Sequence, residues 1–134
     1  MKTTSTTITG YNNSQKEIQK NICDCLEENI NKVLKKNESK IWHGTPVWFI
    51  DGNPIVAYSV RKDGRVSLMF FSGQSFEESD LKPEGKFRAA EIFYTNVHEI
   101  NIIQLKVWLE KSEKIQWDYK NIIKNKGKLN LLTL

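Results

Sequence analysis

The chain has 134 residues, of which 39% are hydrophobic and 27% are charged, and its formal net charge is +4. These values are ordinary for one soluble globular domain that is long enough to bury a core without disulfide or metal support. No apolar run approaches the length of a membrane span, and residues 1–7 lack the apolar centre of a secretory signal. We therefore expect a cytoplasmic protein with no membrane association.

The first predicted element is a helix from about residue 15 to residue 36. Residues 1–13 are rich in Thr, Ser and Asn without a period, so we expect them to form a flexible tail. Ser14 and Glu17 then have the spacing of a capping box. Apolar residues follow at helical spacing on one face, namely Ile18, Ile22, Leu26, Ile30, Val33 and Leu34.

An antiparallel meander is predicted next. Residues 47–50, 55–61 and 66–71 have the composition of strands, and Asp63-Gly64 fits the tight hairpin between the last two. A polar connection at 72–85 leads to a fourth predicted strand at 87–94.

The C-terminal part of the chain is predicted to be helical. Asn101 and Gln104 resemble a second capping box. Two groups at helical spacing follow, which fit either one long helix or two helices broken near Ser112: Leu105, Trp108 and Leu109, then Ile115, Tyr119, Ile122 and Ile123. The predicted fold is α+β, with an N-terminal helix, a meander of about four strands and C-terminal helices packed on one face. The domain is expected to span 14–128, and 129–134 to be a short tail.

Charge and cysteine content argue against two classes of site. Seven lysines and three acidic residues lie between Lys106 and Lys128, so this segment carries the whole positive excess. We interpret it as a solvated helix face, with nucleic-acid binding as the less favoured alternative. Cys23 and Cys25 would point about 200° apart on a helix, so neither a disulfide nor a shared metal ion is expected.

The order and spacing of several motifs resemble the YdhG-like family, catalogued as domain of unknown function 1801. The motifs are Ile41-Trp42-His43-Gly44-Thr45-Pro46-Val47-Trp48, the pair Trp108-Leu109, and Ile115-Gln116-Trp117-Asp118-Tyr119-Lys120-Asn121, within residues 15–127. The resemblance implies a small cytosolic α+β domain with no established enzymatic activity. One branch of the family is described as a frataxin-like iron chaperone, so iron is the one cofactor that the resemblance suggests. The carboxylates available for it are Glu77, Glu78, Asp80 and Glu84.

Adjacent bulky rings on the predicted strands give the best indication of a binding site. Side chains alternate along a strand, so Phe70 and Phe71 cannot both face one core, and neither can Trp48 and Phe49. One ring of each pair must cover a second core, meet a partner or line a groove. The ligand-binding residues that we predict are Trp42, His43, Pro46, Trp48, Tyr58 and Phe71.

These observations favour a non-enzymatic binding module that takes a small ligand or a protein surface through an aromatic groove, with no cofactor. A homodimer is left open. The first alternative is the iron chaperone of the resemblance, and the weaker one is an enzyme that uses His43 with Asp118 or Tyr58.

Overall fold

In the computed structural model, residues 7–35, 37–85 and 87–132 are described. The helices are α1 (Ile8–Asn13), α2 (Glu17–Val33) and α3 (Ile102–Lys114), and two 3-10 turns are present, η1 (Gly73–Phe76) and η2 (Val97–Glu99). The strands are β1 (Glu38–Trp42), β2 (Thr45–Ile50), β3 (Asn53–Val60), β4 (Val66–Phe70), β5 (Lys82–Pro83), β6 (Ala90–Tyr94), β7 (Gln116–Trp117) and β8 (Leu131–Leu132).

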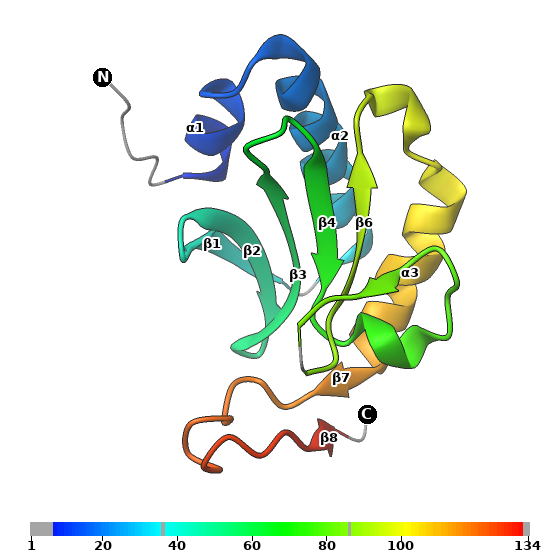
Figure 1. Cartoon of the computed structure of the whole chain (residues 1–134). Coiled ribbons are helices and arrows are strands. Elements are labelled where there is room, and N and C mark those ends of the chain that lie inside the picture. Colours follow the sequence, from blue (N-terminus) through cyan, green and yellow to red (C-terminus); the bar gives the residue numbers. More distant parts are fainter. Residues whose placement is uncertain (1–6, 36, 86, 133–134) are drawn as a thin grey trace.

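Six of the strands form one antiparallel sheet in the order β1-β2-β3-β4-β6-β5. Helices α2 and α3 pack side by side behind this sheet (Figure 1). The predicted α+β class and the antiparallel meander are confirmed, with six strands in place of about four. No described helix combines the length and the hydrophobicity needed to cross a bilayer.

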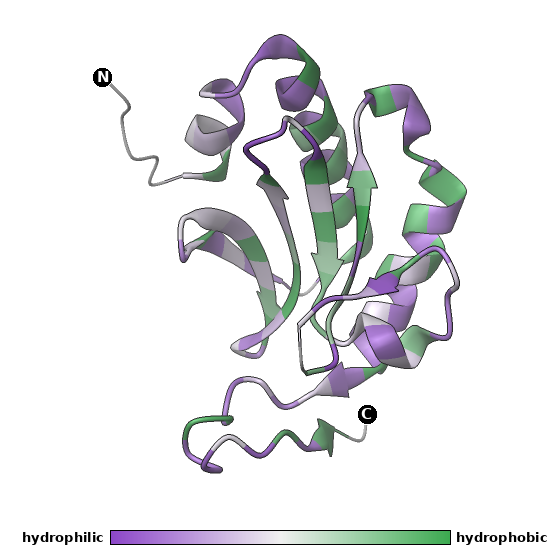
Figure 2. Ribbon diagram, viewed as in Figure 1, coloured by the Kyte–Doolittle hydropathy of each residue, from purple (hydrophilic) through white to green (hydrophobic). Residues whose placement is uncertain are grey.

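The main core lies between the helices and the sheet. Ile22, Leu26 and Ile30 of α2 are fully buried there, as their helical spacing predicts, and so are Leu105 and Trp108 of α3. Figure 2 shows the hydrophobic residues of the sheet and of the two helices along this interface. Ile18 is an exception to the predicted stripe, because it is 55% exposed near the start of α2.

The expected N-terminal tail is partly wrong, because residues 8–13 form α1. Thr7 caps this helix by accepting a hydrogen bond from the Gly10 N–H at 3.0 Å. Asn12 is buried, and its side-chain oxygen accepts a hydrogen bond from the Tyr58 hydroxyl at 2.7 Å. Residues 1–6 of the expected tail lie outside the described residues.

The predicted capping box at Ser14 is also wrong. Ser14 is the C-terminal cap of α1, and its hydroxyl donates to the Tyr11 carbonyl at 2.7 Å. Lys16 occupies the N-cap position of α2 and makes no side-chain capping bond. The helix ends at Val33, three residues before the predicted end at residue 36, which lies outside the described residues.

The C-terminal half of the predicted helical region does not form a helix. Asn101 caps α3 through the Gln104 N–H, as its spacing predicts, but α3 ends at Lys114. The chain then turns extended at Ile115, and β7 pairs with β8, which occupies part of the expected tail at 129–134. Residues 133–134 lie outside the described residues. Neither the single long helix nor the pair of helices is therefore present.

Candidate functional site

The sheet face opposite α2 and α3 is the candidate site, and we call it the open face. Trp48 and Phe70 point into the main core, whereas Phe49 and Phe71 belong to a second, smaller cluster with Val47 and Ala57. The predicted division of adjacent rings between two faces is confirmed for both pairs. In the view of Figure 1, none of the three helices lies in front of the sheet on this side.

Five aromatic side chains form a continuous series of contacts on the open face. Trp42 has its ring centroid 5.5 Å from that of Phe49 and 6.5 Å from that of Phe71. Phe71 lies 5.4 Å from Tyr119, which lies 6.4 Å from Phe87. We call these five residues the aromatic run. The two ends of the run are accessible to solvent, since Trp42 is 37% exposed and Phe87 is 42% exposed.

Tyr119 connects the C-terminal segment to the sheet. Its hydroxyl donates to the Phe71 carbonyl at 2.6 Å and accepts from the Arg88 N–H at 3.1 Å. Burial raises the pKa of Tyr119, and the Arg88 N–H opposes that rise. The predicted place of Tyr119 on a helix is wrong, so its part in the site was missed. The only signal for it in the sequence is the motif from Trp117 to Asn121.

Pro46 explains why the open face is hollowed between β2 and β3. The ladder between these strands reaches Val47, paired with Ala57, and the next residue toward the β1–β2 turn is Pro46. Proline has no N–H to donate to the strand beside it. On β3, the Val60 N–H donates to the Tyr11 hydroxyl at 2.9 Å instead of to β2. The two strands diverge beyond this point, as Figure 1 shows.

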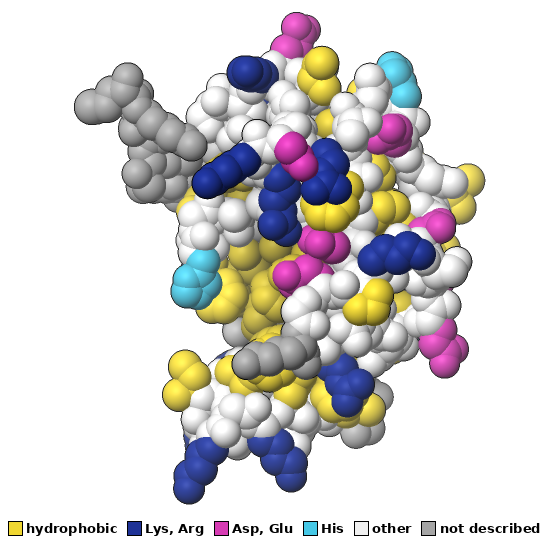
Figure 3. Space-filling view, in the orientation of Figure 1, with side chains coloured by type: hydrophobic (Ala, Val, Ile, Leu, Met, Phe, Trp, Pro, Cys, Tyr) yellow, Lys and Arg dark blue, Asp and Glu magenta, His cyan; other side chains and the backbone are white. Residues whose placement is uncertain are grey.

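Two adjoining hollows lie on the open face, and the smaller one lies where β2 and β3 diverge. The smaller, about 220 Å³, has an apolar floor and several hydroxyl groups, and it is lined by Thr45, Ala57, Tyr58, Ser59, Arg61, Ser67, Met69 and Glu84. The larger, about 530 Å³, is lined by Val60, Arg61, Lys62, Asp63, Arg65 and Phe93. Arg61 borders both hollows. Figure 3 shows hydrophobic side chains in the middle of this face, with basic and acidic ones above them.

Hydrogen bonds fix the polar groups at the boundary between the hollows. One oxygen of Glu91 accepts from the Ser67 hydroxyl at 2.7 Å and from the Arg61 guanidinium at 3.1 Å. Both oxygens of Asp63 accept from Arg65, one from its backbone N–H and one from its Nε. These bonds hold the pKa of the Asp63 carboxyl below its usual value, with the backbone N–H of Arg65 as the main cause.

The structure brings only part of the predicted ligand-binding set to the open face. Trp42 and Phe71 lie there in contact. The Trp48 side chain instead lies in the main core, where its indole N–H donates to Asn31 at 2.8 Å, and the Tyr58 side chain is buried there too. Tyr58 borders the smaller hollow, but its hydroxyl is turned to Asn12 on the other side of the sheet.

His43 and Pro46 have structural roles that their residue types explain. His43 and Gly44 form the two-residue turn between β1 and β2 with φ of 52° and 81°, the left-handed values that such a turn requires. The His43 ring is exposed and lies 4.3 Å from the Trp42 ring. Pro46 is buried, and it ends the ladder between β2 and β3 because proline has no N–H to donate.

The four acidic residues suggested for iron do not converge. Glu78 pairs with Lys111, and Asp80 accepts a hydrogen bond from Gln104 at 2.8 Å. Glu84 borders the smaller hollow instead, and Glu77 is exposed at the end of η1. Within the described part of the chain, no group of three or more His, Cys, Asp or Glu side chains is placed to hold a metal ion.

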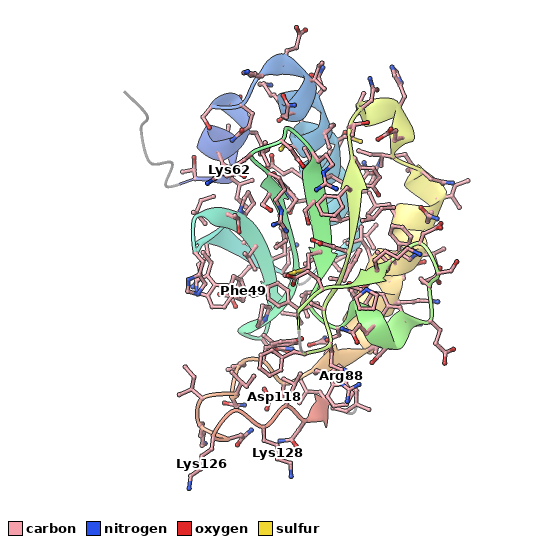
Figure 4. All side chains as sticks on the ribbon, viewed as in Figure 1. Phe49, Lys62, Arg88, Asp118, Lys126 and Lys128 are labelled. Atoms are coloured by element: carbon pink, nitrogen blue, oxygen red, sulfur yellow. The ribbon has the colours of Figure 1, made fainter. Side chains whose placement is uncertain are left out.

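The residues suggested for an enzyme do not form a reactive set around His43. Tyr58 is turned into the main core, as described above. The Asp118 carboxylate accepts hydrogen bonds from the backbone and side chain of Asn121 at 3.0–3.2 Å, which closes a local turn. Among the described residues, His43 makes no side-chain hydrogen bond. Asp118 lies beyond the lower end of the sheet, near Lys126 and Lys128 in the view of Figure 4.

The comparisons with known proteins give no relative for this chain: no family model, no curated protein and no solved structure matches it.

Proposed function

We propose that this protein is a binding module that takes a small ligand with an aromatic or apolar group on the open face of its sheet. The observation that carries the proposal is the division of neighbouring rings between two faces. It leaves the aromatic run beside a hollow, on a face that no helix covers in the view of Figure 1.

The shape of the open face favours a small ligand over a flat protein surface. The smaller hollow has about 220 Å³, and it adjoins the larger one of about 530 Å³. Small-molecule sites are concave, mostly apolar and provided with a few placed polar groups. Ala57 and Met69 supply the apolar floor here, and the hydroxyls of Thr45 and Ser59 supply groups that both donate and accept hydrogen bonds.

The polar groups between the hollows are more simply interpreted as binding groups than as catalytic ones. The Ser67 hydroxyl is buried and is already hydrogen-bonded to Glu91, and Glu91 is paired with Arg61. Within this closed network, the Ser67 hydroxyl serves to hold the Glu91 and Arg61 side chains in position. The iron-chaperone alternative gains no support from the four carboxylates, which are dispersed.

The four tryptophans provide a direct test. A screen of small aromatic fragments by two-dimensional NMR reports on each indole N–H separately. We expect hits that shift the indole resonance of Trp42, which is 37% exposed on the open face, and leave that of Trp108, which is fully buried, in place. Replacing Trp42 with threonine is expected to weaken these hits.

The matched control is Ile103→Thr. Ile103 is 79% exposed on α3 and lies outside both hollows, so the control removes exposed apolar area away from the open face. The proposal fails if no fragment binds at millimolar concentration, or if the hits shift the α3 surface and the open face equally.

A further inference from the structure

Two arginines stand opposite each other at the end of the hairpin that borders the larger hollow. The Arg61 N–H donates to the Arg65 carbonyl at 2.8 Å, next to the pair Val60 and Val66. Alternation along β3 and β4 places both side chains on the open face, with Ser59 and Ser67. Like charges directly opposite on neighbouring strands repel each other. The hairpin therefore keeps a repulsive pair of cations beside a hollow.

One aromatic ring holds both guanidinium groups. The Arg65 guanidinium carbon lies 3.9 Å from the centroid of Phe93, and that of Arg61 lies 5.7 Å from it. Contact with an aromatic face orients a guanidinium and leaves its N–H groups free at the edges. The two side chains are thus positioned before any ligand arrives.

The balance of hydrogen-bonding groups in the larger hollow favours an acceptor-rich ligand. A guanidinium has five N–H groups, and Arg61 and Arg65 each direct one of them to a described carboxylate. Lys62 adds a third cation to the lining and makes no side-chain hydrogen bond to the described residues. The one acid in the lining, Asp63, has both oxygens engaged by Arg65. Donors therefore remain in excess.

We infer that the ligand of the open face carries a negatively charged group, a carboxylate or a phosphate, which Arg61 and Arg65 bind together. This inference rests on the proposed function and specifies the class of ligand. A planar carboxylate or a phosphate accepts paired N–H groups from guanidinium, and it relieves the repulsion between the two arginines. The apolar part of the same ligand lies over Ala57 and Met69 in the smaller hollow.

The acidic residues nearby set the direction in which such a ligand lies. Glu91 is bound to Arg61 and Ser67, and Glu84 borders the smaller hollow. Both would repel a negative group placed in the smaller hollow. The negative group therefore belongs at the hairpin, beside Lys62, and the apolar group points toward the aromatic run. In Figure 4, Lys62 and Phe49 mark these two directions.

The test uses three probes that share one ring system, namely 2-naphthoate, 2-naphthyl phosphate and the neutral 2-naphthamide. Dissociation constants come from NMR titration of the full chain, with the binding site read from open-face resonances. We expect at least one anion to bind about tenfold more tightly than the amide. The carboxylate and phosphate probes separate the two sources of charge.

Arg65→Gln is expected to reduce the affinity for the favoured anion about tenfold and to leave that for the amide unchanged. Arg61→Gln is a second variant, which keeps the inference testable if the first folds poorly. The matched control is Arg88→Gln. Arg88 also lies over an aromatic ring, 4.3 Å from Trp117, but at the end of the sheet opposite Lys62 (Figure 4), so the control should bind the anion as the parent protein does.

Two results overturn the inference and leave the proposed function standing. In the first, the anions and the amide bind the open face equally well. In the second, Arg88→Gln weakens the anion as much as Arg65→Gln does, which would reveal general charge attraction. A third result, in which no probe shifts any open-face resonance, overturns the proposed function together with the inference.

Discussion

Replacing Pro46 with valine tests whether a missing N–H keeps the smaller hollow open. The new amide at position 46 is expected to donate to the Tyr58 carbonyl opposite and to draw β2 toward β3. A ladder bond contributes about 0.5–1.5 kcal/mol net. Loss of the restriction that proline imposes on the unfolded chain costs about 0.4–1 kcal/mol. We therefore expect the free energy of unfolding to change by less than about 1 kcal/mol.

Amide hydrogen exchange is the decisive assay for this variant. A ladder bond at position 46 should slow exchange of that amide at least about 100-fold relative to a free peptide. Exchange of the Val47 amide, which faces Lys40 on β1, should not change. As the hollow narrows, binding of 2-naphthoate should weaken in parallel. An unprotected amide at position 46 in a folded variant would refute this reasoning. In that case Tyr11, whose hydroxyl accepts the Val60 N–H, would be the residue that keeps β2 and β3 apart.

Four further substitutions have expected outcomes. Tyr58→Phe removes a buried hydroxyl that is hydrogen-bonded, so the free energy of unfolding in urea should fall by about 1–3 kcal/mol. Tyr94→Phe removes a buried hydroxyl without a partner among the described residues, so the free energy of unfolding should stay unchanged or rise. Burial raises the pKa of Cys23 from 9.0 to about 12. Between these two pH values the folded protein keeps the thiol proton that the unfolded chain releases. The free energy of unfolding should therefore fall above pH 9 by up to about 1.4 kcal/mol per pH unit. Cys23→Ala should remove this part of the pH dependence when unfolding is measured against pH. Tyr119→Phe should accelerate exchange of the Arg88 amide, which donates to that hydroxyl, and equal exchange in both proteins would mean that the bond contributes nothing.

The division of rings was predictable from the sequence because it depends on one geometric property of a strand. In a regular strand successive side chains point to opposite faces, so one member of Trp48 and Phe49 was expected to leave the core. Which member leaves is set by packing against α2, where Trp48 finds Asn31 for its indole N–H. The sequence carries no signal for that choice, and Trp48 was therefore assigned to the wrong face.

Helix α1 was missed because its stability comes from distant residues. Six residues are too few to form a helix on their own. The partners that hold it, Tyr58 and the backbone of Val60, lie 46 and 49 positions from Asn12 and Tyr11. A window of local sequence sees only a polar segment without a period.

The C-terminal segment shows the opposite error, in which helical spacing was present without a helix. Ile123 is 90% exposed, so the apparent stripe buries little at that position. Asn53 instead donates to the Gln116 side chain and the Trp117 carbonyl and accepts from the Lys120 N–H, all within 3.1 Å. These bonds to another part of the chain replace those that a helix would supply. They also position Tyr119 in the aromatic run, which is why that residue escaped prediction.

The two tight turns that bracket β2 limit how this protein can change. His43-Gly44 precedes the strand and Asp51-Gly52 follows it, and all four residues have left-handed φ values. A strand held in this way at both ends cannot slide along its neighbours by one position. Sliding by one position would exchange Trp48 and Phe49 between the faces. Substitutions within β2 that leave both turns intact should therefore keep Trp48 in the main core and Phe49 on the open face.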